Sequence, residues 1–156
     1  MRLRFLWIGK TKDPLFLKVE ERYLKRIEQY FPTERTTVRD LKKIDPHQQA
    51  AQLEREARQI ERKLSSETYL VVLDSLGKQF TSQRLASFVA ELMNRAVSEV
   101  TFVVGGHLGI SSKIKDLADL KISLTKLTLP HELARIILLE QIYRAVSVIK
   151  GLPYHK

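Results

Sequence analysis

The sequence predicts an α/β fold with a mostly parallel sheet and helices on both faces. Two observations carry this prediction. The runs TYLVVLD (68–74) and VTFVV (100–104) are continuously apolar, as strands are when both faces of their sheet are covered. Segments with the apolar spacing of helices lie between these runs and the other β-rich stretches. Strands that alternate with helices in this way are typical of an α/β sandwich.

The first third of the chain predicts a strand, a helix and a second strand. The apolar stretch LRFLWI (3–8) is strand-like. Asp13 and Pro14 then have the residue types of a helix N-cap and a first helical position. Apolar residues recur at helical spacing over 14–31. The β-rich stretch at 35–41 predicts a strand at the edge of the sheet.

The middle of the chain adds a charged helix and a turn. Residues 46–64 carry a thin apolar stripe on a heavily charged helix, which suits a helix that covers one face of a sheet. After the strand at 68–74, the residues SLGKQ (75–79) predict a turn. A Thr or Ser cap then begins a helix over about 81–97.

The last third begins where the second buried strand runs into a glycine loop, GGHLG (105–109). A short helix at about 112–118 and a β-like run, KISLTKLTL (121–129), come next. The most apolar helix follows at 131–150, and Gly151 occupies the usual position just after a helix end.

The whole chain, residues 1–156, is expected to form one domain. It contains no internal repeat, low-complexity stretch or linker. The helix at 131–150 is apolar around most of its circumference, so it needs burial on more than one side. A sheet supplies one side, and a partner subunit is a reasonable source of the other. We therefore expect a homodimer.

The charge of the chain points to a polyanionic partner. Lys and Arg number 27 against 18 Asp and Glu, which gives a net charge of +9 and a pI near 9.9. The excess is spread over both halves of the chain. A basic folded domain favours RNA, DNA or an anionic membrane, although the charge can also serve solubility alone.

The cysteine and histidine content excludes several kinds of functional site. The chain has no Cys, which excludes disulfides, thiolate catalysis and thiolate metal sites. Its four His are scattered without an acidic cluster, so we expect no metal site. The sequence shows neither a signal peptide nor a transmembrane stretch, and we expect a cytoplasmic protein that does not enter a membrane.

The glycine loop is the first candidate for a binding site. Glycines that follow a buried strand let the backbone approach a ligand closely. The loop lacks the GK[ST] of a P-loop, and it does not follow the first strand as a dinucleotide fingerprint does. Without a cation of its own, it suits a neutral edge such as adenine or ribose. A tight strand-to-helix turn is the alternative interpretation.

Two stretches near the last helix are further candidates. The run LTKLTLPH (124–131) alternates Leu and Thr before a Pro that holds the preceding residue extended. Its free backbone groups can bind the hydrogen-bonding edge of a ligand, although such a run can also be plain structure. Glu140 and Arg144 have the spacing of an i,i+4 ion pair on an otherwise apolar helix. We expect this pair to face a cleft, where the Arg can meet a phosphate.

The last residues bring together a phenol, an imidazole and a cation, in Tyr154, His155 and Lys156. Gly151 ends the preceding helix and Pro153 stiffens the turn. We therefore expect the turn to direct these three residues toward a functional site.

Four motifs together resemble one family. They are VLDSLGK (72–78), FVVGGHLG (102–109), LTLPHELARIILLEQIYRA (127–145) and PYHK (153–156). Their order and spacing are similar to the bacterial ribosomal RNA large-subunit methyltransferase H family, of the SPOUT class of RNA methyltransferases. The resemblance covers the whole chain. It implies a homodimer with a C-terminal trefoil knot and S-adenosylmethionine as methyl donor. The implied reaction is methylation of N3 of a pseudouridine in helix 69 of 23S rRNA in the assembled ribosome.

The resemblance also implies which residues contact the cofactor. They belong to the end of the buried strand, the glycine loop and the run before the proline: Leu73, Gly105, Leu124, Thr125, Lys126, Leu127, Thr128 and Leu129. No role carries over to His107 or Leu108.

The implied reaction suggests roles for the C-terminal residues. N3 of pseudouridine carries a proton at neutral pH, so its methylation needs a general base. His155 is our candidate, either as this base or as the group that holds the water acting as base. Tyr154 is expected to stack on the target base or hydrogen-bond it, and Glu140 to orient Arg144 or the terminal segment. We expect that segment to become ordered only with cofactor and RNA. Three cations are expected to hold RNA phosphates: Arg135, Arg144 and Lys156.

Three other functions stay open on sequence grounds. A SPOUT enzyme acting on tRNA would share the cofactor site, although the Tyr-His-Lys end argues against it. A non-catalytic RNA-binding module would account for the charge alone. A dehydrogenase is disfavoured because the glycine loop is in the wrong place.

Overall fold

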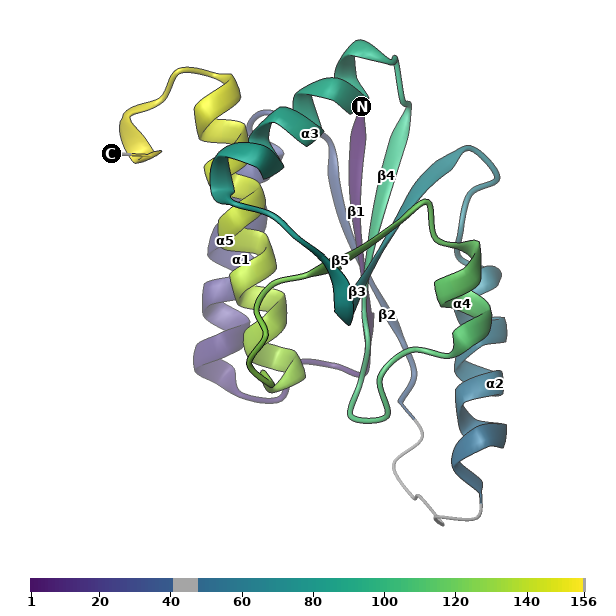
Figure 1. Ribbon diagram of the computed structural model, residues 1–156. Helices are drawn as coiled ribbons and strands as arrows, with labels where there is room; N and C mark the ends of the chain where they lie inside the picture. The colour runs from purple at the N-terminus through teal and green to yellow at the C-terminus, as the bar shows by residue number, and fades with distance from the viewer. Residues whose placement is uncertain (41–47, 156) are drawn as a thin grey trace.

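A five-stranded parallel sheet forms the centre of the protein in a computed structural model, which describes residues 1–40 and 48–155 (Figure 1). The strand order is β2-β1-β4-β3-β5, and all the strand pairs within the described residues are parallel. The predicted parallel sheet is therefore confirmed, as is the placement of the second strand at an edge. The strands are β1 (Arg2–Ile8), β2 (Thr33–Val38), β3 (Thr68–Gln79), β4 (Glu99–Val104) and β5 (Leu120–Ser123).

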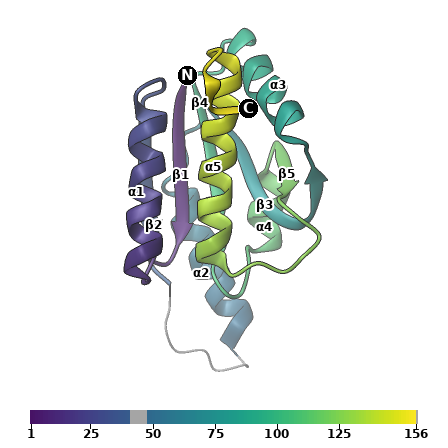
Figure 2. The same ribbon diagram turned by 90° about the vertical axis from the view of Figure 1, so that its left-hand side faces the viewer.

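Helices cover both faces of the sheet, as predicted. Helices α1, α3 and α5 lie on one face, and α2 and α4 lie on the other (Figures 1 and 2). The predicted start of the second helix, at residue 46, lies outside the described residues. The helices are α1 (Pro14–Glu28), α2 (Gln49–Glu61), α3 (Ser82–Asn94), α4 (Ser112–Leu117) and α5 (His131–Ile149), and a short 3-10 turn, η2, covers Pro153–His155.

The capping residues that the sequence predicts are found at the helix ends. The Asp13 carboxylate accepts a hydrogen bond from the backbone N–H of Leu15 (2.8 Å) at the start of α1. Thr81 caps α3 in the same way. At the end of α5, Gly151 has φ +67°, and the N–H of Leu152 donates to the carbonyl of Ser147 (2.8 Å). This Schellman ending turns the chain back toward its own helix.

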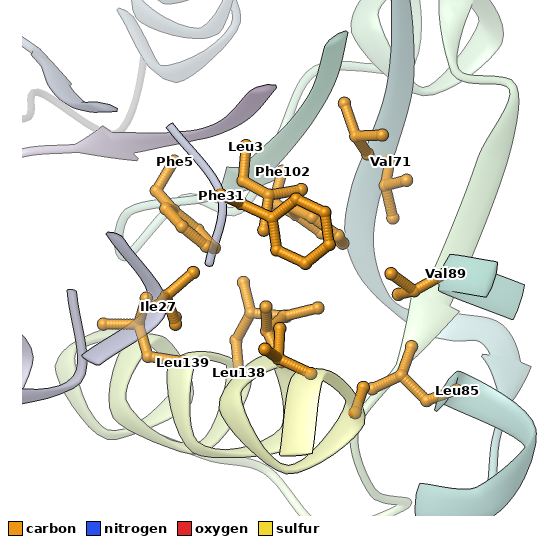
Figure 3. Close-up of a cluster of buried hydrophobic side chains, with 14 of the residues drawn as sticks. Leu3, Phe5, Ile27, Phe31, Val71, Leu85, Val89, Phe102, Leu138 and Leu139 are labelled. Atoms are coloured by element: carbon orange, nitrogen blue, oxygen red, sulfur yellow. The ribbon is translucent and has the colours of Figure 1, made fainter. Parts of the chain in front are cut away.

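Two apolar clusters hold the layers together. The larger one lies between the sheet and α1, α3 and α5, where Phe5 stacks on Phe102 (ring centroids 5.6 Å apart) above Leu138 (Figure 3). The smaller one lies on the other face, where Ile60 of α2 and Ile114 of α4 pack on the sheet. Successive residues of β1 alternate between the two clusters, so both faces of this central strand are buried.

The predicted turn at 75–79 is wrong, because β3 continues through it. Leu73 and Lys78 both pair with Ile122 of β5, so residues 74–77 lie outside the regular ladder. Gly77 lets β3 and β5 come this close, since a Cβ at that position would lie 2.6 Å from the backbone carbon of Ile122.

The predicted β-like run at 121–129 is also largely wrong, because β5 ends at Ser123. The Ser123 hydroxyl donates to the carbonyl of Thr125 (2.9 Å), and the Thr125 hydroxyl accepts from the N–H of Leu127 (3.1 Å). These local hydrogen bonds compete with the ladder and take the chain out of the sheet. Residues 124–130 therefore form an irregular segment between β5 and α5.

Within the described part of the chain, we find no helix with the length and hydrophobicity that a bilayer span requires.

Candidate functional site

A cavity of about 350 Å³ lies where β4 and β5 end and β3 leaves the ladder. We call it the glycine-loop cavity. In open α/β sheets, ligands bind outside the carboxyl ends of the strands, and this cavity has that position. It is lined by residues 73–75, 104–107, 109–110 and 122–129, together with His131 and Ala134.

All eight residues that the resemblance assigns to the cofactor line this one cavity. They come from three elements that are far apart in the sequence: Leu73, Gly105, Leu124, Thr125, Lys126, Leu127, Thr128 and Leu129. The irregular course of 124–130 explains this convergence, because backbone groups that leave a sheet become free to face a ligand. Leu127 is 76% exposed at the rim.

The glycine loop is both a tight turn and a cavity wall. The N–H of Gly109 donates to the carbonyl of Gly106 (3.0 Å), and Gly109 has φ +77°. A Cβ on Gly105 would lie 2.7 Å from the backbone of Gly109. The tight-turn interpretation is therefore confirmed, while the loop's role in binding a ligand stays a prediction that its place in the cavity wall supports.

Asp74 places an ionised carboxylate in the cavity wall. One carboxylate oxygen accepts from the N–H of Leu76 (3.1 Å), and the other pairs with Lys115 (3.0 Å). Burial acts to raise the pKa of Asp74, but Lys115 and the backbone hydrogen bond together hold it below its usual value. No role was expected for Asp74, although a carboxylate that follows a continuous apolar run within a strand is a signal that could have pointed to it.

His131 contributes a neutral imidazole to the same wall. It is the first residue of α5, as predicted, but it also lines the cavity. Burial, and then the positive charge of Arg135, lower the pKa of His131 below its ordinary value.

A second group of predicted residues gathers around the outer side of α5. Arg144 donates two hydrogen bonds to Glu140 (2.6 and 3.0 Å), and the hydroxyl of Tyr154 lies 3.3 Å from the same carboxylate. The hydroxyls of Tyr154 and Tyr23 are 3.3 Å apart, and the Tyr154 ring meets the edge of the Tyr143 ring (centroids 4.7 Å apart). We call these five residues the tyrosine cluster.

The tyrosine cluster gives Tyr154 specific partners through its ring and its hydroxyl. The expectation that the segment becomes ordered only with cofactor and RNA stays a prediction. Burial first, and then Tyr23 and Glu140, raise the pKa of Tyr154 far above its ordinary value, so its phenol stays protonated. Sequence reasoning missed Tyr23, which no spacing rule connects to a residue so far along the chain. The side chain of His155, and Lys156, lie outside the described residues.

The expected phosphate contact of Arg135 is wrong, because its side chain is fully buried (0% exposed). Its guanidinium donates to the carbonyl of Ile8 (2.6 Å) and to the hydroxyl of Thr11 (2.9 Å). It also lies over the ring of Trp7, 5.8 Å from the centroid. Thr11 in turn donates to the buried carboxylate of Glu20 (2.6 Å). Arg135 therefore joins α5 to β1 and the loop after it.

The glycine-loop cavity and the tyrosine cluster do not meet within one chain. No residue of the cluster lines the cavity. Glu140 follows His131 by nine residues along α5, which is about 14 Å and about two and a half turns. The two side chains therefore leave the helix on opposite sides.

Comparisons with known proteins define the class. A family model described as "Predicted SPOUT methyltransferase" matches residues 1–155. The chain therefore belongs to the SPOUT methyltransferase family. This result overturns the alternatives of a dehydrogenase and of a non-catalytic binding module.

Two relatives have a more specific name than the family model. A ribosomal RNA large subunit methyltransferase H from Natranaerobius thermophilus is 38% identical over 160 residues, covering 99% of each chain. The protein of the same name from Streptococcus uberis is 36% identical over 159 residues, covering 100% of each chain.

Solved structures share the fold. A probable methyltransferase from Bordetella pertussis matches with a TM-score of 0.57 at 15% identity, covering 93% of this chain and 96% of that one. A Legionella pneumophila protein in complex with S-adenosylmethionine matches with a TM-score of 0.50 at 13% identity, covering 94% of this chain and 66% of that one.

Proposed function

We propose that this chain transfers a methyl group from S-adenosylmethionine to N3 of a pseudouridine in helix 69 of 23S rRNA. The observation that carries the proposal is the convergence of all eight expected cofactor residues on one cavity in a SPOUT family member. The names of the full-length relatives support large-subunit rRNA as the substrate. The proposed site of action is the assembled ribosome, and hence the cytoplasm.

The glycine-loop cavity fits the proposed cofactor in its chemistry. S-adenosylmethionine has no phosphate, and the cavity lining contains no cluster of cations. The free backbone groups of 124–129 suit the hydrogen-bonding edge of an adenine, and the wall at Gly105 has no side chain to block it. The ionised Asp74 adds a negative charge that favours a cationic ligand. When bound, S-adenosylmethionine supplies an activated methyl group on a positively charged sulfur.

The protein must align the target base and help to remove its N3 proton. We assign the general base to His155, since the raised pKa of Tyr154 keeps that phenol protonated and Glu140 is engaged with Arg144. Tyr154 remains a platform on which the base can stack, a contact worth about 1–3 kcal/mol. Arg144, held by Glu140, and Lys156 are proposed to contact RNA phosphates.

A homodimer would complete the site. In one chain, His131 of the glycine-loop cavity and Glu140 of the tyrosine cluster leave α5 on opposite sides, about 14 Å apart along the helix. A two-fold pairing can place the cluster of one subunit beside the cavity of the other. Apolar residues of α5 that stay half-exposed, such as Leu133, Ile136 and Ile137, are available for such an interface.

Methyl transfer to ribosomes tests the proposal. The protein is incubated with tritiated S-adenosylmethionine and ribosomes from a strain that lacks the modification, and the labelled nucleotide is mapped. We expect one labelled pseudouridine in helix 69 and no label in tRNA. Label in tRNA alone would identify the rival SPOUT activity, and an unlabelled ribosome would contradict the proposed function.

A further inference from the structure

A second cavity, of about 680 Å³, lies beyond the carboxyl ends of β1 and β2. Neither the resemblance nor the proposed reaction assigns it a role. Its walls are the loop after β1 and the last residues of β2 with those that follow: Gly9, Lys10, Lys12, Thr37, Val38, Arg39 and Asp40. We call it the basic cavity.

The charges of this lining favour an anion. Lys10, Lys12 and Arg39 are exposed, and within residues 1–40 and 48–155 none of the three forms an ion pair. Among the described residues of the lining, Asp40 is the one acid. A carboxylate oxygen of Asp40 lies 3.9 Å from a ring nitrogen of His107 in the glycine loop. Asp40 therefore faces His107. Three cations against one acid give the described part of the lining a net positive charge.

Two of the three basic residues that the resemblance led us to expect at RNA phosphates are less available. Arg135 is fully buried and bound to Ile8 and Thr11. Arg144 gives two hydrogen bonds to Glu140. Free cations that converge on a concave surface are better placed to bind phosphate oxygens.

The basic cavity shares structural supports with the glycine-loop cavity. The Glu132 carboxylate accepts hydrogen bonds from the backbone N–H of Lys12 (2.9 Å) and of Asp13 (3.2 Å). Glu132 directly follows His131, which lines the glycine-loop cavity. On the other side, His107 lines the glycine-loop cavity and faces Asp40 of the basic cavity. These contacts join the walls of the two cavities to each other.

We infer that the basic cavity binds the phosphodiester backbone of the RNA substrate, with Lys10, Lys12 and Arg39 as the phosphate contacts. This inference rests on the proposed function. Phosphate contacts fix the register of a nucleic acid on a protein without reading its bases. Here they would place a neighbouring nucleotide at the glycine-loop cavity.

The salt dependence of ribosome binding tests the inference. The triple variant Lys10→Ala, Lys12→Ala and Arg39→Ala is compared with the wild type, using ribosomes that lack the modification. A matched control, Arg55→Ala, Arg58→Ala and Arg62→Ala, removes the same charge from exposed positions of α2 and the residue after it. Each lost phosphate contact lowers the slope of log affinity against log salt by about 0.7–0.9.

We expect the cavity variant to lose about two units of slope and to bind ribosomes at least about tenfold more weakly at moderate salt. The control should lose much less slope. Calorimetry with S-adenosylmethionine should give the wild-type affinity for both variants, which shows that the fold and the glycine-loop cavity are intact. If the triple variant does not fold, the single variants Lys10→Ala and Arg39→Ala replace it, each with an expected slope loss of about 0.7–0.9.

Equal slopes for the cavity variant and the control would overturn the inference, because general charge would then account for binding. Wild-type protein that binds S-adenosylmethionine but neither binds nor methylates ribosomes would instead contradict the proposed function. The two failures are therefore distinguishable.

Discussion

At the scale of single residues, the hydroxyl of Tyr23 joins α1 to the C-terminal segment through its contact with the hydroxyl of Tyr154. Changing Tyr23 to Phe removes the hydrogen bond to Tyr154 but keeps the ring beside Tyr143. A hydrogen bond of this kind contributes about 0.5–1.5 kcal/mol. We expect single-turnover methylation to slow by about two- to tenfold, while the affinity for S-adenosylmethionine stays unchanged.

The matched control for this prediction is Tyr30→Phe, which removes a hydroxyl near the end of the same helix but outside the tyrosine cluster. It should keep the wild-type rate. Equal rates for Tyr23→Phe and the wild type would show that the Tyr23 hydroxyl does not help to position Tyr154 for the reaction.

Arg135 is expected to stabilise the fold. Lysine at this position cannot reproduce the two hydrogen bonds to Ile8 and Thr11 together with the contact over Trp7. Because a buried polar network loses partners, we expect Arg135→Lys to lower the free energy of unfolding by about 2–4 kcal/mol. Urea denaturation measures this change.

The comparison for Arg135 is Arg144→Lys, which alters a partly exposed i,i+4 pair and should cost less than about 1 kcal/mol. A stable Arg135→Lys protein with weakened ribosome binding would restore the phosphate role that we reject.

His131 makes stability depend on pH. Its pKa in the folded protein lies below the ordinary value of 6.5, so the unfolded chain binds more protons as the pH falls below about 6.5. The free energy of unfolding therefore decreases with falling pH in this range. We expect His131→Gln to show a smaller decrease than the wild type between about pH 6.5 and 5. Denaturation curves at several pH values measure it, and parallel decreases would contradict the assignment.

At the scale of elements, the close approach of β3 and β5 shapes the glycine-loop cavity. Gly77→Ala places a methyl group against the backbone of Ile122, which must move. Ile122 and the residues after it line the cavity, so we expect the melting temperature to fall by several degrees and the affinity for S-adenosylmethionine to fall at least about tenfold. Leu76→Ala, at a neighbouring side chain that is 93% exposed, should leave both nearly unchanged. An unaltered affinity in Gly77→Ala would show that β5 can shift without cost to the cavity.

Sequence patterns predicted some of these elements correctly and others wrongly. Apolar runs and caps predicted the parallel sheet and the start of α1 correctly, because those signals are local. The alternation of Leu and Thr at 121–129 imitates the period of a strand, but the hydroxyls of Ser123 and Thr125 bind nearby backbone and end β5 early. The eight expected cofactor residues could be named from motif resemblance, whereas the burial of Arg135 depends on contacts with distant residues that no pattern encodes.

At the scale of the whole molecule, the proposed homodimer makes a prediction about mixed subunits. A truncation that removes Tyr154 to Lys156 should leave fold and dimer intact, because these residues follow the Schellman ending of α5, and it should abolish methylation. A Gly105→Val variant should lose activity because the side chain meets Gly109. If each site uses both chains, equal mixing of the two inactive variants should restore about a quarter of the wild-type activity.

Light scattering provides the control for this experiment, since each variant alone should have the mass of a dimer at micromolar concentration. Mixed samples that stay inactive, although exchange of subunits is demonstrated, would show that each chain builds its own site. A monomeric mass for the wild type would contradict the homodimer itself. The trefoil knot also belongs to this scale and stays a prediction.

Helix α5 carries residues of the glycine-loop cavity near its start and residues of the tyrosine cluster beyond its middle. One rigid element thus sets both the separation and the relative rotation of the two groups. Inserting or deleting a single residue between Ala134 and Glu140 would rotate one group against the other by about 100°. The chain can vary its side chains along this stretch, but the number of residues in it is fixed by geometry. We therefore expect the protein to tolerate changes of side chain in this stretch but not changes of its length.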